Sequence, residues 1–243
     1  MNPQTLEETR ALVASVKRVM QKVRGVDVVV CPPFPFLSAC TRFKKPLYLG
    51  AQDVFWEDAG SFTGDVSASM LASLGASYVI VGHSERRARG ETDDMVSKKA
   101  FAALKAGIAT VVCIGEQTRD EHGAYLEVVK NQIKESLARV PKRMLSGLVI
   151  AYEPVWAIGK SFSEAMSGAD IQHMSIFIRK VLADMYGKEE SADVYILYGG
   201  SVAPINAGDI MEQGAVDGFL VGRQSLDKVA FADIINITAN ANT

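Results

Sequence analysis

The chain has 243 residues, of which 48% are hydrophobic, and its formal net charge is −2. This composition is too apolar for a disordered protein, and the length suits one large single-core domain or two small ones. No Gly/Ser-rich linker or low-complexity tract divides the chain, so we predict a single domain spanning residues 1–243. The near-neutral charge excludes the strongly basic surface that is typical of nucleic-acid and membrane-surface binding, so we expect neither partner.

The cysteines and the N-terminus bear on the compartment. Cys31, Cys40 and Cys113 show neither metal-ligand spacing nor an even-numbered disulfide framework. No stretch has the apolar length of a membrane span, and the N-terminus lacks the basic and then apolar pattern of a signal peptide. The sequence therefore predicts a cytoplasmic protein without a bound metal, and Cys113 is expected to be a small apolar core residue.

The first predicted element is an amphipathic helix. Apolar residues recur at three- and four-residue spacing from Leu6 to Val23. Asn2 suits the cap of this helix, and Pro3 suits its first position. We expect the apolar stripe of the helix to pack on a strand that would precede it, which this sequence does not contain, and on that strand's neighbours.

Short apolar runs and longer helical patterns then alternate along the chain. The runs that predict strands are 26–31, 47–52, 78–82, 109–115, 147–153, 194–200 and 217–222. The helical patterns that alternate with them cover roughly 35–44, 65–75, 94–106, 122–139, 169–186, 204–213 and 225–238. Strands that are apolar on both faces are typical of parallel sheets covered by helices.

This alternation predicts an α/β protein. Two architectures fit it, a TIM (βα)8 barrel and a doubly wound open sheet. With the opening helix, the count is eight helices but only seven strands. Interpreted as a barrel, the chain therefore lacks the first β-strand.

Polar residues follow the predicted strands directly, which is where α/β proteins bind ligands. His83 follows YVIVG in the run GHSERR, and both a catalytic and a structural role fit this position. Glu153 ends the run GLVIAYE. A carboxylate at the end of an apolar strand is partly desolvated, which raises its pKa and suits a general base. An ion pair between Glu153 and a nearby Lys or Arg is the alternative.

Two later stretches predict an anion site. YGGSV (198–202) and LVGRQS (220–225) each place glycine and a polar residue before a helix. Backbone N–H groups at helix starts bind phosphate, and barrels often bind it after their last two strands. The stretch WAIGKSFSEAMSG (156–168) is long, small and polar, and it fits either a mobile lid or an ordinary loop insertion.

Several motifs, taken together and in order, resemble the triosephosphate isomerase family over essentially the whole chain. They are CPPFPFL (31–37), LGAQDVFWEDAGSFTGDVSASML (49–71), YVIVGHSERR (78–87), CIGE (113–116), AYEPVWAIG (151–159), YGGSV (198–202) and DGFLVG (217–222). The resemblance implies a (βα)8 barrel that isomerises dihydroxyacetone phosphate and D-glyceraldehyde 3-phosphate through an enediol(ate) and without a cofactor. It also implies a place in glycolysis and gluconeogenesis.

The resemblance carries roles over to individual residues. Glu153 is similar to the family's catalytic base, and His83 to its neutral electrophile, a division of labour already known for this enzyme. Gly159, Ser201 and Gly222 match the positions that grip the substrate phosphate, as does the position of Arg223.

A further implication concerns assembly. Phe62 and Thr63 lie in the loop that, in the family, reaches into a partner subunit. The resemblance therefore implies a homodimer.

Three departures from the family pattern stand out. The family begins with a strand followed by N-W-K-M-N, whose Asn and Lys line the active site, whereas this sequence starts at Met1 and Asn2. After Gly159 the lid reads Lys160 and Ser161 in place of Thr-Gly-Lys. The usual Gly-Gly after the last strand is Gly222 followed by Arg223, which still offers a backbone N–H to phosphate.

The first departure bears on the reaction rate. Loss of one well-placed stabiliser of the developing charge costs on the order of 10²- to 10³-fold in rate. Three interpretations remain open at this point: an isomerase whose true start lies upstream, a catalytically impaired barrel that binds phosphorylated small molecules, and a fragment completed by another polypeptide that supplies the strand.

Overall fold

The computed structural model of the chain describes residues 2–40, 43–159 and 166–241. Seven strands form one parallel sheet in the sequential order β1 to β7. They are β1 (Val28–Val30), β2 (Leu47–Ala51), β3 (Tyr78–Val81), β4 (Ala109–Ile114), β5 (Leu148–Tyr152), β6 (Tyr195–Tyr198) and β7 (Gly218–Phe219). Each lies within a predicted apolar run.

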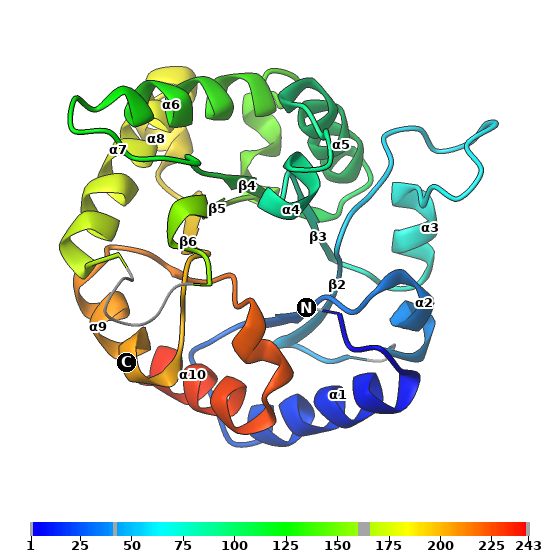
Figure 1. The fold of residues 1–243 in the computed structure, drawn as a ribbon. Coiled ribbons are helices and arrows are strands. Elements are labelled where there is room, and N and C mark those ends of the chain that lie inside the picture. The colour runs from blue at the N-terminus through cyan, green and yellow to red at the C-terminus, as the bar shows by residue number, and fades with distance from the viewer. Residues whose placement is uncertain (1, 41–42, 160–165, 242–243) are drawn as a thin grey trace.

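The sheet curls around the centre of the molecule, and the helices surround it (Figure 1). A doubly wound sheet would reverse its strand order at a switch point, and this sheet does not. The fold is therefore that of a TIM barrel. Within the described residues the sheet ends at β1 and β7, which do not pair with each other, so the expected count of seven strands is confirmed there.

The helices outnumber the eight that the sequence pattern predicts, because the described residues contain ten α-helices. These are α1 (Leu6–Met20), α2 (Phe34–Leu37), α3 (Ala68–Ser73), α4 (Ser84–Arg87), α5 (Asp93–Lys105), α6 (Ala124–Ser136), α7 (Gly168–Tyr186), α8 (Lys188–Ser191), α9 (Pro204–Gln213) and α10 (Lys228–Ala241). Short 3₁₀ turns add η1 (Ser38–Cys40), η2 (Lys142–Gly147), η3 (Val155–Ala157) and η5 (Arg223–Leu226). The additional helices α4 and α8 have four residues each, which is too short for an amphipathic period to reveal.

Helix α1 begins later than the sequence pattern predicts. Thr5, not Asn2, caps it: the Thr5 hydroxyl accepts the Glu8 N–H at 3.1 Å, and the Glu8 carboxylate accepts the Thr5 N–H at 3.3 Å. This reciprocal pair satisfies two backbone N–H groups that the helix leaves free, which favours a start at Leu6 over one at Pro3.

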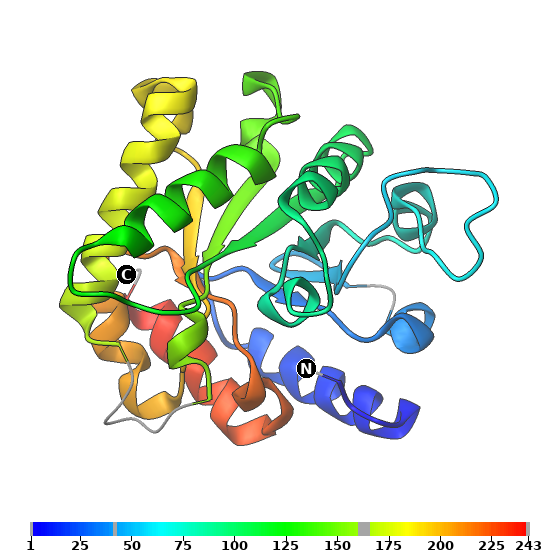
Figure 2. The same cartoon turned by 45° about the horizontal axis from the view of Figure 1, so that its top comes forward.

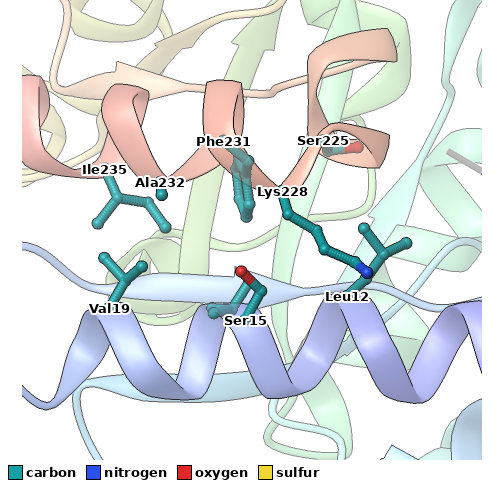
Figure 3. A pocket seen from close by; sticks show the side chains of 9 residues that line it. Leu12, Ser15, Val19, Ser225, Lys228, Phe231, Ala232 and Ile235 are labelled. Atoms are coloured by element: carbon teal, nitrogen blue, oxygen red, sulfur yellow. The ribbon is translucent and has the colours of Figure 1, made fainter.

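The apolar stripe of α1 packs against both a helix and strands. Val16 on α1 belongs to one buried cluster with Val28 on β1 and Ile235 on α10. Figure 3 shows Val19 of α1 facing the side chains of α10, and a small cavity lies between the two helices. The stripe is thus buried between the outer helix layer and the edge of the sheet, which agrees in part with the expected packing on a strand.

The sheet is buried on both faces. A large apolar cluster lies between the strands and the helices, and a smaller one that includes Val111, Cys113 and Val149 fills the barrel interior. Cys113 is completely buried, as expected of a core residue. None of the helices in the described residues is long and apolar enough to cross a membrane.

One segment projects beyond the barrel. The chain between β2 and α3 extends outward as a loop in both views, coloured cyan (Figures 1 and 2). Phe62 in this loop is 40% exposed, and its ring packs 4.7 Å from that of Phe55. Thr63 is also exposed.

Candidate active site

The two residues predicted to carry chemistry lie side by side. His83 follows β3 after one glycine, and Glu153 follows β5 directly. Since parallel strands bring their carboxyl ends to one rim of the barrel, both side chains reach the same mouth. The Nε2 atom of His83 lies 3.1 Å from Oε1 of Glu153. Among the described residues, the partner of the carboxylate is therefore an imidazole, and not the Lys or Arg of the alternative interpretation.

Glu153 sits in a nearly dry environment that favours its protonated form. Its side chain is 3% exposed. Burial raises the pKa of this carboxyl, and the adjacent His83 ring together with the Ser84 N–H, which donates to Oε2 at 3.0 Å, offsets part of the rise. The Cys113 thiol also lowers the pKa of the carboxyl, to a smaller extent. A carboxylate with a raised pKa accepts a proton from carbon more readily than an ordinary one.

The hydrogen bonds around His83 assign its tautomer. The backbone N–H of Glu85, in the first turn of α4, donates to Nδ1 of His83 at 3.2 Å. An atom that accepts a hydrogen bond carries no proton, so the ring proton is on Nε2 and points to Glu153. His83 is thus a neutral imidazole that can donate a hydrogen bond into the mouth of the barrel, where its side chain is 31% exposed.

Two further groups support the site but were not singled out from the sequence. Ser84 supplies the backbone N–H described above. Glu116, which follows β4, is completely buried and accepts hydrogen bonds from the Tyr152 hydroxyl at 2.9 Å and from the Trp156 Nε1–H at 2.8 Å. The sequence pattern that singled out Glu153, a carboxylate directly after an apolar run, also applies to Glu116 and could have identified it. The chain just beyond Glu153 is anchored to this second buried carboxylate.

The predicted phosphate residues come from three separate loops that meet. The Ser201 hydroxyl, after β6, donates to the carbonyl of Ala157 at 2.9 Å. A Cβ placed on Gly159 would lie 3.0 Å from Nη2 of Arg223, the residue that begins η5 after β7. Gly222 precedes it in an open position where a Cβ would meet nothing within 4 Å. The loops after β5, β6 and β7, which carry the predicted phosphate residues, therefore lie next to one another.

This group adjoins the predicted base. Gly199, two residues before Ser201, packs so closely that a Cβ there would lie 2.8 Å from Cγ of Glu153. Residues 160–165 of the expected lid, which include the departures at Lys160 and Ser161, lie outside the described residues. In the part that the structure describes, no three His, Cys, Asp or Glu side chains are grouped as metal ligands.

Comparison with known proteins decides the family. The family model described as triosephosphate isomerase matches residues 1–238. The chain belongs to the triosephosphate isomerase family. It is 47% identical over 236 residues to the triosephosphate isomerase of Moorella thermoacetica, covering 96% of this chain and 93% of that protein. The enzyme of the same name from Natranaerobius thermophilus is 42% identical over 234 residues, 95% of this chain and 90% of the relative.

Membership in the triosephosphate isomerase family confirms the resemblance carried by the motifs, and with it the barrel fold. A third relative with the same name, from Thermoanaerobacter pseudethanolicus, is 44% identical over 214 residues, 86% of each chain. Phe62 and Thr63 lie on the projecting loop between β2 and α3, a segment separate from the loops that carry the other predicted site residues.

Proposed function

We propose that this chain is a single-domain isomerase that interconverts dihydroxyacetone phosphate and D-glyceraldehyde 3-phosphate in glycolysis and gluconeogenesis, without a cofactor. The observation that carries the proposal is the buried carboxylate of Glu153 beside the neutral imidazole of His83, in a chain of this family. A base and a hydrogen-bond donor at one barrel mouth are what an aldose–ketose isomerisation requires.

The chemistry assigns one task to each side chain. Glu153 removes a proton from the carbon next to the substrate carbonyl, and the electron pair of that C–H bond forms the enediolate. The Nε2–H of His83 donates to the oxygen on which negative charge develops, which stabilises that charge. The proton of the neighbouring substrate hydroxyl moves to the charged oxygen, and return of the proton from Glu153 to the neighbouring carbon completes the isomerisation, so no redox partner is consumed.

The substrate phosphate is assigned to the loops after β5, β6 and β7. Gly159 and Gly222 leave their backbone accessible, Ser201 adds a hydroxyl, and Arg223 adds a charge. Backbone N–H groups and a guanidinium bind phosphate oxygens strongly because the hydrogen bonds are charge-assisted. Binding at this remote end holds the reacting carbons beside Glu153.

The proposal extends to assembly and compartment. The exposed Phe62 and Thr63 on the projecting loop are assigned to the interface of a homodimer. Three free cysteines support a cytoplasmic location. Sedimentation of the wild-type chain and of a Thr63→Arg variant tests the interface: the wild type is expected to sediment as a dimer and the variant as a monomer.

The activity is tested in protein purified from a host that lacks its own triosephosphate isomerase, so that a low rate cannot come from contamination. The wild type is compared with Glu153→Gln, which keeps the size of the side chain but cannot accept the proton. We expect the Gln variant to lose about 10²- to 10⁴-fold in kcat. Glu190→Gln, at an exposed carboxylate paired with Lys142, is the matched control and should retain full activity.

One outcome would contradict the proposal. If the wild type has no activity above that of Glu153→Gln, the chain is not an isomerase by this mechanism. Titration with dihydroxyacetone phosphate then identifies a catalytically impaired barrel, since binding without turnover is its signature.

A further inference from the structure

A second group of charges, of which Asp53, Glu91 and Lys99 are buried and Arg86 is 40% exposed, lies beside the candidate active site, and the mechanism above does not use it. Lys99 on α5 is 3% exposed; its ammonium lies 2.8 Å from Oδ1 of Asp53 and contacts Oε1 of Glu91. Arg86 on α4 completes the group, with its guanidinium 2.6 Å from Asp53 and 3.4 Å from Glu91. The group contains two cations and two carboxylates, so its charges balance.

The energetic cost of such a group calls for an explanation. Removing charged groups from water costs several kcal/mol for each ion, and ion pairing often only restores what was lost. Replacing a buried ion pair with apolar residues of similar volume is often neutral or stabilising, so stability alone does not explain this group. The group therefore points to a role beyond the stability of the fold.

The second oxygen of Glu91 leads directly to the active site. Oε2 of Glu91, whose side chain is 3% exposed, accepts the backbone N–H of Gly82 at 3.0 Å. Gly82 is the residue before His83, and its φ of +71° is a conformation that favours glycine. The carbonyl of Gly82 accepts a hydrogen bond from Nε of Arg87 at 2.7 Å. Charged side chains thus hold the peptide groups on both sides of Gly82.

Arg87 is itself held firmly from three directions. Its guanidinium donates to Asp93 at 2.5 Å, to the Ser136 hydroxyl at 3.1 Å and to the Cys113 carbonyl at 3.2 Å. Because Gly82 has no side chain to restrict its backbone angles, these contacts help to set the direction in which the chain leaves β3. That direction sets where the imidazole of His83 points.

We propose that Glu91 is a positioning residue for His83. Held by Lys99 and Arg86, the Glu91 carboxylate fixes the Gly82 peptide and thereby keeps Nε2 of His83 opposite Glu153. The inference rests on the proposed function, since it concerns the donor used in the isomerisation. A shift of about 1 Å in a reacting group costs on the order of 100-fold in rate.

The test compares two double variants that keep the buried charges balanced. Glu91→Gln with Lys99→Met retains an amide oxygen that accepts the Gly82 N–H, whereas Glu91→Leu with Lys99→Met removes the acceptor. Both leave the pair of Asp53 and Arg86 in place. We expect the Leu variant to lose about 10- to 100-fold in kcat at unchanged KM, and the Gln variant to stay within about threefold of the wild type.

A readout besides activity separates positioning from a structural role. Nitrogen NMR of the His83 ring reports its tautomer and its bond to Glu153, and the Gly82 amide shift reports its acceptor. The ring signals should move in the Leu variant and stay near wild-type values in the Gln variant. Equal kcat and equal ring signals in the two variants would overturn the proposal, whether both retain activity or both lose it.

Two further provisions keep the test decisive. If the Leu variant does not fold, the Gly82 amide signal of the Gln variant is compared with that of the wild type. Replacing the charged acceptor of this amide with a neutral one must shift its NMR signal and speed its hydrogen exchange. An unchanged Gly82 amide would then refute the role of Glu91. A wild type without isomerase activity would count against the proposed function only, since the NMR comparison does not depend on turnover.

Discussion

The backbone of Gly115 packs directly against the backbone of Glu153, so closely that a Cβ on Gly115 would lie 1.8 Å from the Glu153 carbonyl oxygen. Backbone atoms cannot move aside as a flexible side chain can. We therefore predict that Gly115→Ala destabilises the protein by about 1–3 kcal/mol or more and also lowers kcat, because it displaces the base. Urea unfolding and the isomerase assay measure the two effects.

Gly208 on α9 provides the matched control. A Cβ there would meet only Cγ2 of Ile237 at an ordinary 3.8 Å. Since alanine is the better helix former, Gly208→Ala should raise the free energy of unfolding by about 0.5–1 kcal/mol and leave activity unchanged. Equal stability of the two variants would show that the tight contact at Gly115 does not exist.

We predict that His83→Gln lowers kcat by about 10²- to 10³-fold, because the variant loses the preorganised donor to the developing charge. The backbone of the site should remain intact, so KM should change little by comparison. The exposed His173 on α7 offers a control, since His173→Gln should be fully active. A comparable loss of activity in both variants would remove His83 from the mechanism.

The raised pKa of Glu153 predicts how stability depends on pH. Between the unfolded carboxyl value of about 4.3 and the raised folded value, the native state binds more protons than the unfolded state. The contribution of Glu153 to the free energy of unfolding therefore falls as the pH rises through this window. Glu153→Gln, which stays neutral, should gain stability relative to the wild type over the same window, as denaturant titrations from pH 4 to pH 8 would measure.

The same shift predicts the acid limb of catalysis. Because the base must be unprotonated, kcat/KM should fall on acidification around a pKa above that of an ordinary glutamate. If the stability of Glu153→Gln relative to that of the wild type falls as the pH rises, the sign of the pKa shift is contradicted.

Arg223 offers a test of the phosphate site. Arg223→Gln removes the charge but keeps the backbone N–H, so we predict a roughly 10-fold rise in KM with kcat nearly unchanged. Inorganic phosphate should inhibit the variant more weakly than the wild type. Arg139→Gln, at an exposed arginine paired with Asp94 after α6, controls for the loss of a surface charge. A loss confined to kcat would argue that Arg223 does not bind the phosphate.

Much of the fold was predictable because the decisive signals are local. Each strand is a contiguous apolar run, and a parallel sheet buries such a run on both faces, so all seven strands could be located. The one-turn helices α4 and α8 escaped notice because four residues do not complete a recognisable period. The start of α1 was misplaced because the capping pair of Thr5 and Glu8 competes with an equally good cap at Asn2.

What the sequence determined by itself was the order of strands and helices and the position of His83 and Glu153 at strand ends, since both depend on residues adjacent in the chain. Only the tertiary structure decided which groups meet: Ser84 reaches Glu153 across 69 positions, and Lys99 reaches Asp53 across 46. Those contacts arise because the sheet curls and brings the ends of β2, β3 and β5 to one rim, and no local pattern of residues encodes such a distance.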